Sequence, residues 1–165
     1  MKPISTLEDA LTMELENLYS SEEKLRDRFL KIDKIIHTDE LRDIIHRYTE
    51  SCDNKRLKIN RVFGYLHHEP HLSTTRVMDE LIEESVQRLK FAQDPDVQEQ
   101  ILINCIERIN IYKTCTYEAS LRYAEELELD IACDQLSTII QWERQTKKEL
   151  ADLSAHLFSI KDYVA

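Results

Sequence analysis

Glycine is almost absent from this chain, which has one glycine (Gly64) and three prolines among its 165 residues. β-Sandwiches and β-barrels reverse direction in many tight turns, and such turns draw heavily on glycine and proline. The shortage of both therefore predicts an all-α protein with few, short connections between long helices. A chain of this length with 42% apolar residues can bury one substantial core, so we expect a single domain over residues 1–165.

Acidic residues outnumber basic ones by 32 to 22, which gives a net charge of −10. Such a surface repels nucleic-acid phosphates and anionic lipids, so neither nucleic acid nor a membrane is an expected partner. Apolar runs such as residues 101–103 are too short to span a bilayer, and the N-terminus turns acidic where a signal peptide is apolar. The four cysteines are scattered without a Cys-x-x-Cys pair, which favours reduced thiols in a cytoplasmic protein.

Apolar residues recur in steps of three and four along most of the chain, which is the period of helices packed in a bundle. The four long stripes run over residues 5–36, 38–66, 94–127 and 131–157, and a shorter one runs over 75–92. Ser5 and Glu8 have the spacing of a capping box at the start of the first helix. Asp94 followed by Pro95 marks the start of the third long helix.

The connections between these helices predict how the bundle is wired. The first and second long helices are joined by a short connection, as are the third and fourth, so each pair forms an antiparallel hairpin. A long crossover, which contains the short helix, joins the two hairpins. This order predicts a ferritin-like antiparallel four-helix bundle.

Charged residues interrupt the apolar stripes near the middle of each long helix. They are Glu14 and Glu22 on the first helix, Lys55 on the second, Lys113 on the third and Glu143 on the fourth. Three inward carboxylates would suit half of a di-metal site, but a lysine ammonium has no lone pair for a metal and repels a cation. We therefore expect one polar layer in the core. The alternative is that each residue lies at the edge of its stripe and extends to water.

Several motifs resemble the YciE/YciF-type ferritin-like family, in the same order and over roughly residues 3–158. They include Ile4-Ser-Thr-Leu-Glu-Asp9, Glu14-Leu15, Leu18-Tyr-Ser-Ser-Glu22, Leu81-Ile-Glu-Glu84, Asp94-Pro-Asp-Val97, Tyr112 with Tyr117, and Leu150-Ala-Asp-Leu153 after Glu143. The resemblance implies a bacterial, cytosolic, all-α protein that is often dimeric and associated with stress responses. It also implies an interior lined by carboxylates and histidines that suits two metal ions.

The sequence departs from the family pattern at the positions where metal would bind. Glu14, Glu22 and Glu143 match the family's inward glutamates, so they are candidate remnants of a metal site, which we expect to hold no metal. The family's histidine on the second helix falls on Lys55. On the third helix, a Glu-His-Tyr-Glu stretch becomes Asn110-Ile-Tyr-Lys113, and an aspartate three residues after Glu143 becomes Thr146. We expect the two lysines to balance the glutamates, with Asn110 and Thr146 donating hydrogen bonds to the remaining oxygens.

Two further groups of residues could carry chemistry. His67, His68 and His71 surround Pro70 and could chelate a metal, although a solvated loop that binds nickel or zinc adventitiously is the favoured interpretation. Three tyrosines could border a redox centre in metal-bearing relatives, and here they are expected to be core residues with hydrogen-bonded hydroxyls. These are Tyr19, Tyr112 and Tyr117.

The leading functional hypothesis is a non-catalytic, stress-associated homodimer that needs no cofactor. The short helix carries apolar residues that a second copy could bury, or that could cap one end of the helix's own bundle. They are Met78, Leu81, Ile82, Val86, Leu89 and Phe91. The alternative is an iron- or manganese-binding protein, or a ferroxidase, that uses Glu14, Glu22 and Glu143. A carrier of a small ligand in the bundle core is a third possibility, without a motif in its favour.

Overall fold

The computed structural model describes residues 4–72 and 75–162, and within these ranges it contains helices and no strand. The elements are α1 (Leu7–Phe29), a 3₁₀ helix η1 (Asp33–Ile35), α2 (Asp39–Tyr65), α3 (Arg76–Phe91), α4 (Pro95–Glu126) and α5 (Asp130–Asp162). The predicted all-α class is confirmed.

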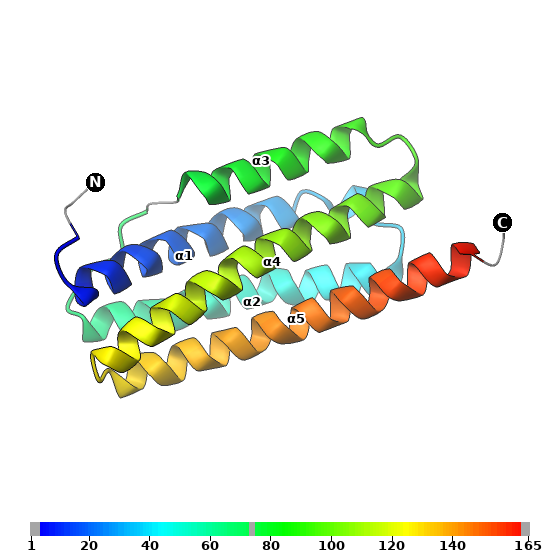
Figure 1. Ribbon diagram of the computed structural model, residues 1–165. Coiled ribbons are helices and arrows are strands. Elements are labelled where there is room, and N and C mark those ends of the chain that lie inside the picture. Colours follow the sequence, from blue (N-terminus) through cyan, green and yellow to red (C-terminus); the bar gives the residue numbers. More distant parts are fainter. Residues whose placement is uncertain (1–3, 73–74, 163–165) are drawn as a thin grey trace.

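Four of the helices lie side by side as an elongated bundle (Figure 1). Around the bundle, α1 packs against α2, α2 against α5, α5 against α4, and α4 against α1. The pairs α1–α2 and α4–α5 are antiparallel hairpins, and the crossover between them carries α3 along the side of α4 (Figure 1). The expected bundle and its wiring are therefore confirmed. The short helix lies along the bundle and does not cap its end.

The apolar core consists of two clusters, one toward each end of the bundle. One cluster contains Leu25, Tyr48, Ile106 and Leu150 among others. The other contains Leu11, Leu18, Ile59, Tyr117 and Leu136 among others. Fully burying one such side chain stabilises the fold by roughly 1.5–3 kcal/mol, so both clusters contribute strongly. The polar layer described below lies between them.

The first helix begins one residue later than the sequence pattern suggested. Thr6, not Ser5, is its N-cap: the Thr6 hydroxyl accepts a hydrogen bond from the Asp9 amide at 3.0 Å, and the Asp9 carboxylate accepts from the Thr6 amide at 3.1 Å. The predicted pairing of Ser5 with Glu8 is therefore wrong, because Asp9 occupies the third helical position relative to the true cap.

The end of the first helix also differs from its expected position. The helix stops at Phe29, although the apolar pattern continues to Ile36. Ile36 is buried all the same, because the connection through η1 packs back onto the end of the bundle. The apolar pattern therefore predicts correctly that Ile36 is buried, but it does not predict that the helix ends before this residue.

A buried carboxylate from α4 closes the start of α2. Thr38 is the N-cap of α2, but its side chain makes no capping bond within that helix. Instead the carboxylate of Glu99 accepts hydrogen bonds from the His37 amide, from the Thr38 amide at 2.6 Å and from the Thr38 hydroxyl at 2.5 Å. An acid at a helix N-terminus also interacts favourably with the helix dipole. This tie fixes the start of α2 against α4.

No helix within residues 4–72 and 75–162 combines the length and apolar character that crossing a membrane requires.

Candidate functional site

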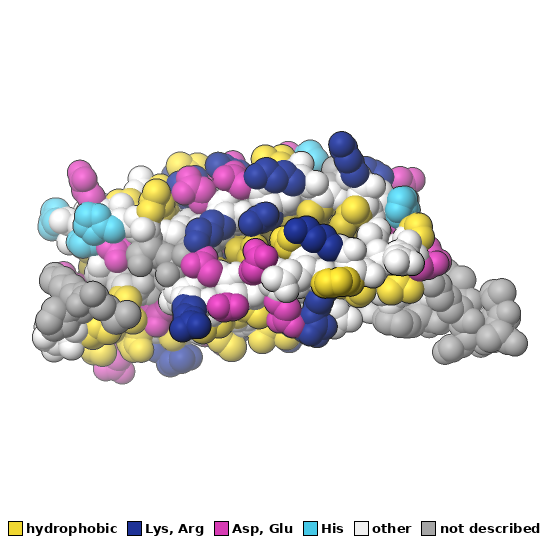
Figure 2. Space-filling model, turned by 90° about the horizontal axis from the view of Figure 1, so that it is seen from above, with side chains coloured by type: hydrophobic (Ala, Val, Ile, Leu, Met, Phe, Trp, Pro, Cys, Tyr) yellow, Lys and Arg dark blue, Asp and Glu magenta, His cyan; other side chains and the backbone are white. Residues whose placement is uncertain are grey.

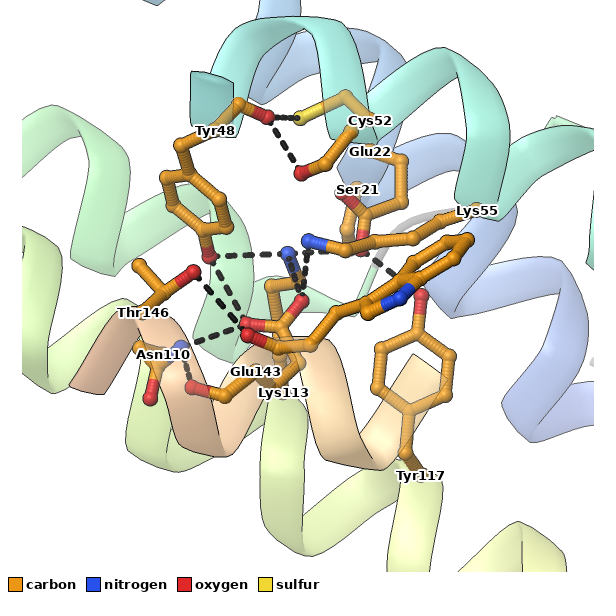
Figure 3. Close-up of polar contacts among 12 residues, drawn as sticks. Ser21, Glu22, Tyr48, Cys52, Lys55, Asn110, Lys113, Tyr117, Glu143 and Thr146 are labelled. Carbon is orange, nitrogen blue, oxygen red and sulfur yellow. Dashed lines mark hydrogen bonds and ion pairs between the residues drawn. The ribbon is translucent and has the colours of Figure 1, made fainter. Parts of the chain in front are cut away.

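Four charged side chains, one from each helix of the bundle, meet at its middle. Glu22 comes from α1, Lys55 from α2, Lys113 from α4 and Glu143 from α5, and all four are 0% exposed. Figure 3 shows both lysine ammonium groups pointing toward the Glu143 carboxylate. The apolar stripes bring them together, because each charged residue replaces one inward-facing apolar position near mid-helix.

The ion pairs of this layer are short. The Lys113 Nζ atom lies 2.6 Å from Glu22 Oε1 and 2.9 Å from Glu143 Oε1. The Lys55 Nζ atom lies 2.5 Å from the same Glu143 oxygen. Glu143 Oε1 therefore lies within ion-pair distance of two ammonium groups. Two carboxylates and two ammonium groups cancel, so the layer has no net formal charge.

Two buried tyrosines extend the layer. The Tyr48 hydroxyl accepts a hydrogen bond from Lys113 Nζ at 3.0 Å and donates one to Glu143 Oε2 at 3.1 Å. The Tyr117 hydroxyl donates to Glu22 Oε1 at 2.8 Å. The Nζ atoms of Lys55 and Lys113 also lie 4.3 and 4.8 Å from the centre of the Tyr48 ring, within the range of a cation–π contact. In the sequence Tyr48 is only one rung of an apolar stripe, so its polar role was missed.

Asn110 and Thr146 behave differently from each other. The Asn110 side-chain amide donates hydrogen bonds to Glu143 Oε2 at 2.6 Å and to the Glu143 carbonyl at 3.1 Å. The Thr146 hydroxyl does not bond to the leftover carboxylate oxygens. It donates to the Trp142 carbonyl at 3.1 Å, within its own helix. A threonine hydroxyl often bonds to the carbonyl four residues earlier, and here that local partner takes the donor.

Glu14 does not belong to the layer. It is half-buried, burial raises its pKa above the ordinary value of 4.5, and no described residue pairs with it. Eight residues separate Glu14 from Glu22, which places it about 12 Å further along α1 and turned by about 80° around the helix. The expected balance of three carboxylates against two lysines is therefore wrong, and the layer has two of each.

The charges in the layer determine the pKa values of its members. Burial alone would raise the pKa of Glu143, but Lys113 and Lys55 outweigh burial and lower it to about 2. Burial would lower the pKa of Lys113, but Glu143 and Glu22 raise it well above its ordinary value of 10.5. Glu143 is therefore a carboxylate and Lys113 an ammonium throughout the neutral range.

The donor set of this layer does not fit a di-metal centre. Such a centre needs carboxylates and imidazoles from all four helices. Here the positions on α2 and α4 hold lysines, whose ammonium groups offer no lone pair. One oxygen of each carboxylate already lies within 2.9 Å of an ammonium nitrogen. The interpretation of Glu14, Glu22 and Glu143 as remnants of a metal site stays a prediction.

The histidine-rich loop is arranged differently from the expected chelate. His68 and His71 lie near each other and near Glu16 of α1, whereas His67 is exposed and is not part of this group. Sequence reasoning missed Glu16 because an acid on a helix far from the loop gives no local signal. The described cysteines are all free thiols.

The three tyrosines singled out in the sequence are indeed packed in or against the core. Tyr117 bonds to Glu22, as described above. The Tyr112 hydroxyl lies 2.7 Å from the Thr75 hydroxyl, and Tyr19 packs edge-on against Phe63. Only Tyr117 of these three contacts the charged layer. The Tyr112 hydroxyl also accepts a hydrogen bond from the Asn17 side-chain amide at 3.3 Å, so it links α1 to α4 outside the layer.

Comparison with known proteins agrees with the ferritin-like bundle. The crystal structure of the Escherichia coli stress protein YciF matches with a TM-score of 0.88 and 22% identity, over 94% of this chain and 99% of that one. The structure of YcfI from Rhodopseudomonas palustris matches with a TM-score of 0.87 and 21% identity, over 91% of this chain and 96% of that one. No curated protein matches this chain in sequence. The model of a family described as a domain of unknown function, DUF892, matches residues 6–161, which confirms the resemblance found in the sequence, and this chain belongs to that family.

Proposed function

We propose that this chain is a non-catalytic helical-bundle protein of the bacterial cytoplasm that acts by association with itself under stress. One observation carries the proposal: two buried lysines occupy the layer in which metal-bearing relatives are expected to hold their ligands. The likeness to YciF, which is described as a stress protein, supports the link to stress. YcfI, provisionally described as a structural protein, is consistent with a role other than catalysis.

The chemistry of the layer supports a structural role. Oxidation of iron in four-helix bundles depends on two metal ions bridged by carboxylates. A metal ion entering here would have to displace Lys113 from two carboxylates at 2.6 and 2.9 Å and leave its charge buried without a partner. An unpaired buried charge costs several kcal/mol. The lysines therefore occupy the layer in place of metal and hold the four helices together.

A second candidate function is iron or manganese binding at a partial carboxylate site. The observation in its favour is that Glu22 Oε2 is buried without a hydrogen-bond partner. One such oxygen supplies one ligand, and a metal ion in an oxygen-rich site takes about six. The association proposal therefore ranks first.

Elemental analysis of protein purified without a histidine tag separates these two candidates. Cells grown with added iron and manganese should yield protein with far less than one iron or manganese ion per chain. Two ions per chain, lost when Glu22 is replaced by glutamine, would overturn the non-catalytic proposal. The matched control is Glu23→Gln, at the neighbouring surface carboxylate that pairs with Arg56.

The surface around the end of α3 and the start of α4 supports self-association. Phe91, the last residue of α3, is 84% exposed, although its helix packs on the bundle. A groove of about 390 Å³ where the end of α3 meets the start of α4 is lined by apolar residues of α4, such as Val97 and Ile101, and by Arg88 and other polar residues. Figure 2 looks down on this face and shows hydrophobic side chains between charged ones. A twofold dimer would bury this surface against its own copy.

Sedimentation velocity at tens of micromolar tests the dimer. The unmodified chain should sediment as a dimer, and Phe91→Glu should shift it to a monomer because a carboxylate would replace a large apolar contact. Leu57→Glu is the matched control, because Leu57 is 61% exposed on α2, which packs mainly against α1 and α5. A monomeric unmodified chain, or equal dissociation by both variants, would contradict the proposed interface.

A further inference from the structure

We propose that Glu16 of α1, together with His68 and His71 of the loop after α2, forms a zinc site that ties this loop to the bundle. The carboxylate and imidazole ligand atoms of these three residues all lie within 4.8 Å of one another. The site is separate from the buried layer and independent of the function proposed above. Histidine side chains gather at the left-hand end of Figure 2, which is the end at which α2 finishes in Figure 1.

The end of α2 holds His68 in a defined place. His67 adopts a left-handed backbone with φ of 50°, so it reverses the chain after the last helical turn. The His68 amide then donates to the Phe63 carbonyl at 3.1 Å, and the His67 amide donates to the Gly64 carbonyl at 3.4 Å. This pair of bonds is a Schellman motif. The His68 ring also packs on the Phe63 ring, with their centres 5.8 Å apart, so the imidazole is positioned before any metal binds.

Glu16 supplies the ligand from the other element. Its Oε1 atom lies 3.0 Å from His68 Nε2, and its side chain is only 18% exposed. The next residue of α1 holds the far side of the same loop, because Asn17 Oδ1 accepts a hydrogen bond from the Thr75 amide at 2.9 Å. Glu16 and Asn17, which are adjacent on α1, therefore contact the loop near its start at His68 and near its end at Thr75.

His71 completes the set from the loop itself. Its ring lies perpendicular to the His68 ring, with their centres 5.6 Å apart. Ligand atoms around a tetrahedral zinc ion lie about 3.4 Å apart, given zinc–nitrogen bonds of about 2.0–2.1 Å. The 4.8 Å spread must therefore shrink on binding. His71 is exposed, so turning its side chain displaces no core atom.

The ligand chemistry favours zinc over the harder cations. Two imidazoles and one carboxylate are a common zinc ligand set, with water in the fourth position. Magnesium and calcium prefer oxygen ligands and would gain little from the two imidazoles. Bound zinc would connect the first hairpin to the crossover, and it would stabilise the folded chain by mass action because the three ligands come together only in the fold.

Zinc titration by calorimetry tests the site in the full chain, without a histidine tag and after removal of metal by a chelator. One zinc ion should bind per chain. His71→Gln and Glu16→Gln should each weaken zinc binding at least about tenfold. Replacing even an outer-shell partner of a metal ligand costs about 10–100-fold in affinity, and these two residues are ligands. His67→Gln is the matched control, because His67 is exposed in the same loop but outside the cluster, and it should leave the affinity unchanged.

Cobalt gives a second readout that does not depend on affinity. Four-coordinate Co²⁺ absorbs visible light far more strongly than six-coordinate Co²⁺, so the intense bands should appear in the unmodified chain and vanish in His71→Gln. Circular dichroism of each metal-free variant should match the unmodified chain. Full affinity in Glu16→Gln would mean a histidine chelate confined to the loop. That outcome, equal losses in His67→Gln, or no stoichiometric binding would overturn the proposal and leave an adventitious ion only.

Discussion

Two carboxylates of the same helix, six residues apart, meet basic groups in different surroundings. Glu22 faces Lys113 in the middle of the bundle, where both side chains are 0% exposed. Glu16 faces His68 at the end of the bundle, where the side chains are 18% and 32% exposed. The ammonium of Lys113 has no lone pair with which to bind a metal ion, whereas an imidazole nitrogen can bind one. The basic partner, more than the carboxylate, decides which chemistry each place supports.

The two ion pairs differ in burial, and burial determines how much stability is lost when a pair is broken. A buried ion pair need not add stability over an apolar core, but breaking it leaves a charge with no water to solvate it. An exposed pair contributes about 0–1 kcal/mol, because water replaces a lost partner. The buried layer should therefore respond strongly to single substitutions, and the end of the bundle weakly.

Lys113→Met should have the largest effect. The change removes the ammonium that lies between Glu22 and Glu143 and leaves both carboxylates undercompensated. The free energy of unfolding should fall by about 3–5 kcal/mol, measured by guanidinium denaturation. Lys147→Met is the control: Lys147 is exposed on α5, so its replacement should change stability by less than about 0.5 kcal/mol. Similar small losses in both variants would contradict the expected cost of leaving the buried carboxylates without their ammonium partner.

Acid should remove the contribution of Glu143. Its pKa is lowered from 4.5 to about 2 in the fold, so its stabilisation is complete above about pH 5 and is lost as the pH falls toward 2. The expected loss is about 3 kcal/mol, from the size of that shift. The pKa of Lys113 is raised above 10.5, so its contribution is complete below that pH and is lost only at higher pH.

Unfolding by urea at a series of pH values measures this profile. Asp152→Asn is the control, because Asp152 is an exposed carboxylate on the same helix. The free energy of unfolding lost between pH 5 and pH 3 should differ by less than about 0.5 kcal/mol between this variant and the unmodified chain. A profile that is flat down to pH 3 would contradict the lowered pKa of Glu143.

Lys55→Met should destabilise the fold less than Lys113→Met. Among the described residues, Lys55 forms an ion pair with Glu143 alone, and that carboxylate keeps Lys113 at 2.9 Å and the Asn110 amide at 2.6 Å after the change. The expected loss is about 2–3 kcal/mol by the same denaturation measurement. A loss greater than that of Lys113→Met would mean that Lys55, not Lys113, is the centre of the layer.

Glu16→Gln should have the smallest effect in metal-free protein. The pair with His68 is partly exposed, so the expected loss is about 0.5 kcal/mol or less. Thermal melting with and without zinc separates the stability of the pair from that of the proposed site. A loss as large as that of Lys55→Met in the absence of metal would remove the distinction between the middle and the end of the bundle.

The charged residues of the bundle also show which side-chain positions the sequence could predict. The inward direction of Lys55 and Lys113 follows from their places on apolar stripes, because a residue in step with buried neighbours shares their face. Glu14 shows the limit of that argument. It lies three residues after the buried Leu11 and four before the buried Leu18, but its position eight residues before Glu22 puts it about 80° around the helix and about 12 Å along it from Glu22.

Side chains that act across elements were the hardest to predict. Glu99 is buried because it caps the start of α2 from another helix, and Glu16 matters because the loop after α2 folds back onto α1. Neither has a local signature, since each partner lies more than 50 residues away in the chain. In the sequence Tyr48 is one of the apolar residues of its stripe. Only the fold shows that its hydroxyl bonds to Lys113 and Glu143.

The sequence by itself determined the helices, their order and the polar character of the middle layer, because helical period, capping residues and the shortage of glycine act locally along the chain. The tertiary structure alone decided that two carboxylates face two ammonium groups, which hydroxyls join them, and that Glu16 meets His68 and His71. These outcomes depend on the rotation and depth of packed helices, where a shift of one helical turn moves a side chain by about 5.4 Å and changes every charge partner that it can reach.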